Sequence, residues 1–352
     1  MSFGAHHYVP VLKVKRGEKR ALRLLSASAH SGVTPLLEIV ERTARTLDAH
    51  LDNAFKDLAE SVSRFGRCFI DSCEIAPDGA AAAAEVFQRA ATSGIAFTPV
   101  TGISRTVDVG AALAHRGLGL ALRLRRDEFE AGGLGARVRG FMTLHGLAPE
   151  DTDLIVDLGA VDDMVTVGVE ALAGAFLAEV PDHTRWKTFT LSACAFPPSM
   201  GGVERRSHDF AERVEWMAWR DGQHVRRTTL ARLPTFSDGV IQHPMGVEGF
   251  DPRTMPVSAS VRYTAVDRWL LIKGESTRLT PPSIQFQSLA TQLVYGHLQP
   301  HYYGATHCAG CASIKAVADG ATGFGSLEGW RRLGTIHHIT TVVQELRALP
   351  WP

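Results

Sequence analysis

Short apolar runs alternate with amphipathic stretches over most of the chain. Eight runs of strand length precede residue 245, each bounded by glycine, proline or charged residues, at 8–14, 34–40, 68–73, 96–101, 119–124, 153–158, 188–194 and 235–241. Stretches with apolar residues at helical spacing separate most of them, at 42–65, 80–91, 127–145 and 164–180. This alternation predicts a parallel sheet, and eight repeats predict a TIM-barrel-like (β/α)8 fold. A doubly wound open sheet is the alternative, although no glycine-rich phosphate turn follows the first strand.

The pattern changes after residue 245. The segments 259–266 and 269–273 predict an antiparallel hairpin, and 284–295 has helical spacing. A glycine- and cysteine-rich loop is expected at 304–325, followed by a closing helix at 326–349 with Ser326 as its N-cap. We therefore expect a barrel over 1–245 and a C-terminal extension over 246–352 that packs on it.

Composition and charge narrow the classes of function only slightly. Lys+Arg and Asp+Glu are equal at 37 each, so the overall charge favours neither nucleic acid nor a membrane surface. No apolar run reaches the ~20 residues of a membrane span. The five cysteines are an odd number, which predicts reduced thiols and a cytoplasmic protein.

Charged residues lie where the predicted strands end, and active sites of (β/α)8 barrels form at that end. The carboxylates Glu38, Asp71 and Asp157 are the predicted general acid/base groups. The predicted substrate-binding residues are Lys13, Lys15, Arg123, Arg125 and Asp238. Carboxylate oxygens suit Mg²⁺ or Mn²⁺, and the cations suit a phosphate-bearing ligand. The alternative is that these side chains pair with each other as salt bridges at the rim.

A second candidate site lies near the C-terminus. Cys308 and Cys311 have metal-ligand spacing, and His337 and His338 follow on the closing helix. Adjacent helical residues point about 100° apart, so only one of these histidines can join the cysteines. We predict a zinc site of Cys308, Cys311 and His338, with buried thiols and packed histidines as the alternative.

The two ends of the chain carry motifs that are unusual in combination. The opening YVPVLKVKRGEKRAL, the late CAGC and the closing GWRRLGTIHHITTVV together resemble the beta protein family of bacteria and phages. The matching positions are Tyr8, Pro10, Lys13, Gly17, Glu18, Trp330, Gly334, His337 and His338. The resemblance implies a role in phage–host conflict and transfers no catalytic residues.

Two functions from different classes follow. The first is a barrel that binds a small anionic ligand bearing phosphate or a nucleotide, with metal-assisted hydrolase or lyase chemistry at the rim. The second is a non-catalytic binding module of antiphage defence that recognises a phage protein or nucleic acid. The hairpin at 259–273 is also a candidate surface for a homo-oligomer.

Overall fold

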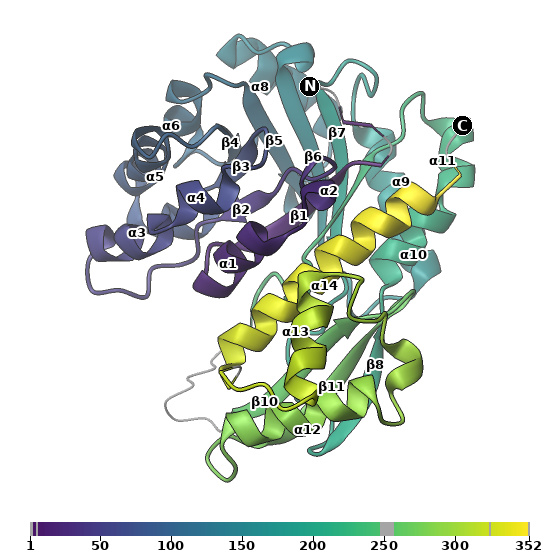
Figure 1. Ribbon diagram of the computed structural model, residues 1–352. Helices are drawn as coiled ribbons and strands as arrows, with labels where there is room; N and C mark the ends of the chain where they lie inside the picture. The colour runs from purple at the N-terminus through teal and green to yellow at the C-terminus, as the bar shows by residue number, and fades with distance from the viewer. Residues whose placement is uncertain (1–2, 5, 247–256, 324, 351–352) are drawn as a thin grey trace.

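Eight parallel strands close into a barrel in the computed structural model, which describes residues 3–4, 6–246, 257–323 and 325–350 (Figure 1). The strands are β1 (Tyr8–Lys13), β2 (Leu36–Glu38), β3 (Cys68–Asp71), β4 (Phe97–Thr101), β5 (Leu120–Arg125), β6 (Thr152–Ala160), β7 (Thr188–Cys194) and β9 (Thr235–Asp238). They pair in that order, and β9 closes the ring on β1 through the register Tyr8↔Phe236. The predicted (β/α)8 barrel is therefore confirmed, and each of the eight predicted runs overlaps one of its strands, although β5 and β6 extend beyond the predicted bounds.

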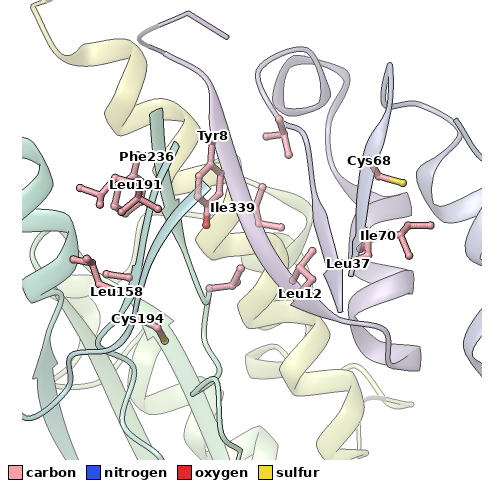
Figure 2. Close-up of a cluster of buried hydrophobic side chains, with 14 of the residues drawn as sticks. Tyr8, Leu12, Leu37, Cys68, Ile70, Leu158, Leu191, Cys194, Phe236 and Ile339 are labelled. Atoms are coloured by element: carbon pink, nitrogen blue, oxygen red, sulfur yellow. The ribbon is translucent and has the colours of Figure 1, made fainter. Parts of the chain in front are cut away.

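The two faces of the barrel strands bury different sets of side chains. Val9, Leu36, Phe69, Ala121 and Ile155 fill the interior, together with Val100. Their neighbours along the strands point outward and pack under the surrounding helices, as the labelled side chains in Figure 2 show. Because side chains alternate along a strand, burial on both faces requires the continuous apolar runs seen in the sequence.

Eleven helices accompany the barrel strands up to β9 in the described part of the chain. They are α1 (Arg16–Leu24), α2 (Ala27–His30), α3 (Leu47–Phe55), α4 (Leu58–Val62), α5 (Ala80–Thr92), α6 (Val109–Ala114), α7 (Arg126–Glu130), α8 (Leu134–His145), α9 (Thr166–Glu179), α10 (Val214–Asp221) and α11 (Gln223–Thr229). The alanine run of α5 is a strong helix former and also packs closely, with Ala83 and Ala90 fully buried.

A second, three-stranded antiparallel sheet lies beside the barrel. The predicted hairpin is confirmed as β10 (Ser258–Thr264) and β11 (Arg268–Ser276), and a third strand, β8 (Ser207–Glu212), pairs with β11. We did not predict β8, which comes from the connection between β7 and α10 and therefore from within the segment 1–245. The small sheet thus draws on two separate parts of the sequence.

Three helices complete this part: α12 (Pro282–Val294), α13 (Ala309–Ala318) and α14 (Leu327–Ala348). The prediction of a loop over 304–325 was wrong for its centre, which forms α13. Cys311, Ile314 and Val317 recur at spacings of three and are buried on one side of that helix, a period that the glycines and cysteines of the segment obscured.

Helix α14 joins the two parts of the molecule. It packs against α1 and β1 of the barrel and against β10 and α13 of the small sheet, and Figure 1 shows it running along both. Ser326 caps it as predicted, because its hydroxyl accepts a hydrogen bond from the Gly329 N–H at 3.0 Å. Among the described helices, none has the length and apolar character needed to cross a membrane.

Candidate anion site at the barrel rim

A layer of charged side chains closes the barrel interior at the C-terminal ends of its strands. Two residues after the interior apolar residue of β2, β3, β5 and β6 the sequence has Glu38, Asp71, Arg123 and Asp157. The period of two along a strand aims all four into the barrel. Lys13 ends β1 at the same level, in register with Glu38.

Arg123 stands at the centre of this layer. Its Nη1 donates to Glu38 Oε1 at 2.7 Å and to Asp71 Oδ2 at 2.9 Å, while Nε and Nη2 donate to Asp157 Oδ2 at 2.8 and 2.7 Å. Although burial opposes the charge, Asp157, Glu38 and Asp71 raise the pKa of Arg123 well above its usual range. The predicted anion-binding arginine therefore already has three carboxylate partners.

Asp71 belongs to a deeper network and is not among the residues that line the cavity described below. Arg105 Nη2 donates to Asp71 Oδ1 at 2.7 Å, and the backbone N–H of Cys73 donates to the same oxygen at 2.9 Å. Burial opposes ionisation, yet Arg105 and Arg123 hold the pKa of Asp71 below its usual range. The structure thus places this predicted catalytic carboxylate where it acts as a buried counter-ion.

Asp238 lies in the core between the barrel and α14. It accepts hydrogen bonds from the Tyr8 hydroxyl, from His338 Nε2 at 2.9 Å and from the Val240 N–H at 2.9 Å. Its side chain is about 1 % exposed. Asp238 therefore does not line the cavity described below, and its hydrogen bonds link β9, β1 and the last helix.

A cavity of about 1390 Å³ opens above the charged layer, between the barrel rim and the small sheet. Of the predicted site residues, those that line it are Lys13, Lys15, Glu38, Arg123, Arg125 and Asp157. The small sheet and its surroundings add cations that the sequence analysis did not select, namely Arg205, Arg262, Lys273 and Arg331. Among the described lining residues, nine are Lys or Arg and six are Asp or Glu, so the cavity wall has an excess of positive charge.

This excess concentrates where α1, β10 and α14 meet. Arg331 and Lys15 form no ion pair within the described ranges, and Arg262 donates only to the Ile241 carbonyl, at 2.7 Å. Burial and the nearby Arg331 lower the pKa of Arg262 to about 9, and the same two causes lower the pKa of Lys15. The negative charge of Glu18 partly offsets the effect of Arg331 on the pKa of Arg262. One oxygen of that carboxylate accepts a hydrogen bond from Gln242.

The predicted metal ligands near the C-terminus come together only in part. His338 uses both ring nitrogens elsewhere, because Nδ1 pairs with the Thr264 hydroxyl at 2.8 Å and Nε2 pairs with Asp238. His337 is the histidine that lies beside the cysteines, with Nδ1 3.3 Å from Cys311 Sγ. The choice of His338 as a ligand therefore needs correction, since α14 turns that ring toward the barrel.

Comparison with known proteins identifies the family. The model of the family described as "Beta protein" matches residues 8–344, nearly the whole chain. The chain belongs to the beta protein family. Comparison with curated proteins gives no significant match.

Two solved structures resemble this family member loosely. One is a mandelate racemase/muconate lactonizing protein from Herpetosiphon aurantiacus, with 11% identity, a TM-score of 0.33, and coverage of 77% of this chain and 63% of that protein. The other is the enoyl reductase domain of MlnA from the macrolactin biosynthesis cluster of Bacillus amyloliquefaciens, with 9% identity, a TM-score of 0.36, and coverage of 97% and 92%. The chain thus spans less than two thirds of the first of these proteins, and superpositions this loose carry no information about the site.

The motifs that carry the family resemblance meet in space. Tyr8 of the opening motif and His338 of the closing motif bind the same carboxylate, that of Asp238. A Cβ atom at Gly17 would lie 3.3 Å from the Glu328 side chain, and one at Gly334 would lie 2.7 Å from the Arg262 carbonyl oxygen. These motifs therefore hold α14 against the barrel on one side and against the small sheet on the other. In this position α14 forms part of the cavity wall.

Proposed function

We propose that this beta protein binds a small phosphate-bearing anion in the cavity above the barrel rim. The observation that carries the proposal is the group of Lys15, Arg262 and Arg331, three cations that face one cavity without an ion-pair partner among the described residues. Like charges in a partly desolvated site repel each other, and a bound anion relieves that repulsion. Guanidinium groups also match the geometry of phosphate oxygens.

The size of the cavity suits a nucleotide rather than a bare ion. Cavities for small ligands usually measure about 300–1000 Å³, and this one exceeds that range. The apolar ring of Trp330 and the polar groups of Ser258 and Ser260 also line it, which gives a base or sugar something to contact beyond the phosphate.

The proposal concerns binding rather than acid–base chemistry. Glu38 and Asp157 are the two predicted catalytic carboxylates that line the cavity, and both are engaged by Arg123. Arg123 thus binds one oxygen of each carboxylate, and its positive charge lies where the two carboxylates come together. This arrangement favours a structural role for Glu38 and Asp157 beneath a bound ligand over a role as general acid and base.

The test is calorimetric titration of the full chain with inorganic phosphate, pyrophosphate, AMP and ATP, with adenosine as the uncharged comparison. We expect binding of at least one phosphate-bearing probe and none of adenosine alone. Arg331→Gln should weaken that binding by about 10- to 100-fold, the value of one lost charged hydrogen bond. Arg64→Gln, at an exposed arginine outside the cavity, is the matched control and should change nothing.

Two results would overturn the proposal. One is that none of the four phosphate-bearing probes binds to folded protein. The other is that Arg331→Gln and Lys15→Met bind a probe as tightly as the unmodified chain does, which would mean that the anion sits elsewhere.

A further inference from the structure

Four side chains of metal-ligand type converge between α13 and α14, apart from the cavity described above. They are His307, Cys308, Cys311 and His337, in the sequence order His-Cys-Ala-Gly-Cys followed by a histidine 26 residues later. One candidate ligand atom from each of His307, Cys308 and His337 lies within 4.8 Å of the others. Cys311 lies outside that group of three, but its Sγ is 3.3 Å from His337 Nδ1, so the second sulfur borders the group on the His337 side.

The local fold explains why the cysteines reach this point. Cys308 is the N-cap of α13, and its sulfur accepts the backbone N–H of Cys311 at 3.3 Å, so both thiols face the same side of the first turn. Gly310 lies between them against α14. A Cβ atom there would come within 2.5 Å of the Leu333 carbonyl oxygen and 3.4 Å of the Cys308 sulfur. A glycine at this position is therefore what allows the two helices to approach closely enough to bring His337 to the thiols.

The hydrogen bonds of His337 leave a lone pair directed at the cluster, and those of His307 leave one ring nitrogen unused. His337 Nε2 lies 2.7 Å from the Thr264 carbonyl oxygen, which can only accept, so Nε2 carries the proton and Nδ1 carries the lone pair. His307 Nε2 pairs with the Thr341 hydroxyl at 3.0 Å, which leaves its Nδ1 available. Metal-binding histidines usually have the second ring nitrogen held in this way, because the partner fixes both the tautomer and the ring orientation.

We infer that Cys308, Cys311, His307 and His337 bind a Zn²⁺ ion in a structural site that ties α13 to α14. Zinc bonds of about 2.3 Å to sulfur and 2.0–2.1 Å to nitrogen set the edges of the tetrahedron at roughly 3.4–3.8 Å. The separation of 3.3 Å between Cys311 Sγ and His337 Nδ1 is close to such an edge. Zinc would displace the thiol proton that now lies between these two atoms.

The setting of the cluster favours a closed structural site over an open catalytic one. Cys311 and His337 are fully buried, while His307 and Cys308 are half-buried and leave a route for the ion. None of the four residues lines the cavity at the barrel rim. The zinc site is therefore independent of the proposed anion binding, and either can fail without the other.

A competing use of the same cysteines is a reversible disulfide, because two thiols at the start of a helix with two residues between them also suit redox chemistry. The experiment separates the two. The full chain is purified without chelator, and its zinc content is measured by plasma mass spectrometry; reduced apoprotein is then titrated with Co²⁺ under exclusion of oxygen. We expect one equivalent of zinc per chain, and a cobalt spectrum with thiolate charge-transfer bands and the strong d–d bands of a tetrahedral site.

Substitutions assign the ligands. Cys308→Ser and His337→Gln should each lose most of the bound zinc, while Cys73→Ser and His297→Gln, at a thiol and an imidazole outside the cluster, should retain it. If a variant fails to fold, alkylation of the unmodified chain still decides the matter, because zinc should protect Cys308 and Cys311 from the reagent and leave Cys73 reactive. The inference would be overturned if reduced protein bound neither Zn²⁺ nor Co²⁺, or if both ligand variants retained zinc. A Cys308–Cys311 disulfide in metal-free protein would support the redox alternative instead.

Discussion

Replacing Arg123 by methionine removes the cation that three carboxylates share at the top of the barrel. Methionine keeps much of the side-chain volume, so the change is mainly one of charge. Among the described residues, the cations left in ion pairs with these three carboxylates would be Lys13, 3.9 Å from Glu38, and Arg105, 2.7 Å from Asp71. Breaking a buried ion pair costs about 3–5 kcal/mol, a large part of the ~5–15 kcal/mol that stabilises a typical domain.

The pH dependence gives this prediction its sharpest form. In the unmodified chain the pKa of Asp71 is below its usual value, so its contribution to stability is present at neutral pH and is lost only in strong acid. Without Arg123, burial would raise the pKa values of the uncompensated carboxylates, and the folded state would take up protons that the unfolded state does not. The stability of Arg123→Met should therefore increase more steeply than that of the unmodified chain as the pH falls from about 7 to about 5, since the unmodified chain has the smaller increase that the raised pKa of Glu215 gives.

Urea unfolding followed by fluorescence at both pH values measures the effect. Arg125→Met is the matched control, because Arg125 lies two residues further along β5 and its side chain makes no ion pair within the described residues. It should cost less than about 1 kcal/mol. A loss below about 1 kcal/mol for Arg123→Met at neutral pH, or the same pH slope as the unmodified chain, would refute the view that Arg123 is a structural hub.

Three further predictions follow from buried groups. Burial raises the pKa of Glu215 to about 8 from its ordinary 4.5, so the folded carboxyl keeps its proton while the unfolded one ionises, and stability is lost as the pH rises between these values. In urea titrations, Glu215→Gln should therefore gain stability relative to the unmodified chain, by on the order of 1–4 kcal/mol between about pH 5 and about pH 8. A difference that stays constant with pH would contradict the raised pKa. Tyr8→Phe removes a donor to the buried Asp238 carboxylate and should cost about 1.5–3 kcal/mol by the same measurement, whereas an unchanged midpoint would mean that the hydroxyl is dispensable. Gly310→Ala should destabilise the chain by about 1–3 kcal/mol and reduce zinc retention, because its Cβ would meet a carbonyl oxygen of α14. The control is Gly140→Ala, in a helix with open space around the Cβ, which should stabilise the chain by about 0.5–1 kcal/mol.

The barrel could be predicted from the sequence because its strands are buried on both faces, and burial on both faces leaves an apolar run that is visible without any partner. The strand β8 has no such signature. Four of the six residues of its sequence SHDFAE are polar, and its side chains are half-buried or exposed throughout. What makes it a strand is the pairing with β11, in which Ser207 faces Lys273 across 66 residues of sequence. A contact over that distance leaves no local periodicity to read.

The part of the candidate site that the barrel strands supply was predictable in its members but not in its pairings. Strand ends identified Glu38, Asp157 and Arg123 correctly as rim residues, yet nothing in their spacing shows that the arginine binds the carboxylates rather than a ligand. Arg262 and Arg331 were missed because they come from the small sheet and the last helix, outside the set of barrel strand ends. The arginines within the closing GWRRLG motif were the available signal.

The orientation of α14 about its own axis decides which of its residues face the cavity and barrel and which face the cysteines of α13. Arg331 and His338 are seven residues apart, two helical turns, so they point to the same side of the helix, toward the cavity and the barrel. His337 points about 100° away from His338, toward α13 and its cysteines. Both Gly334 and Gly310 lie where a side chain would push α14 off its neighbours. Because adjacent histidines are chemically identical in sequence, only this orientation, set by close backbone packing, assigns His338 to Asp238 and His337 to the thiols.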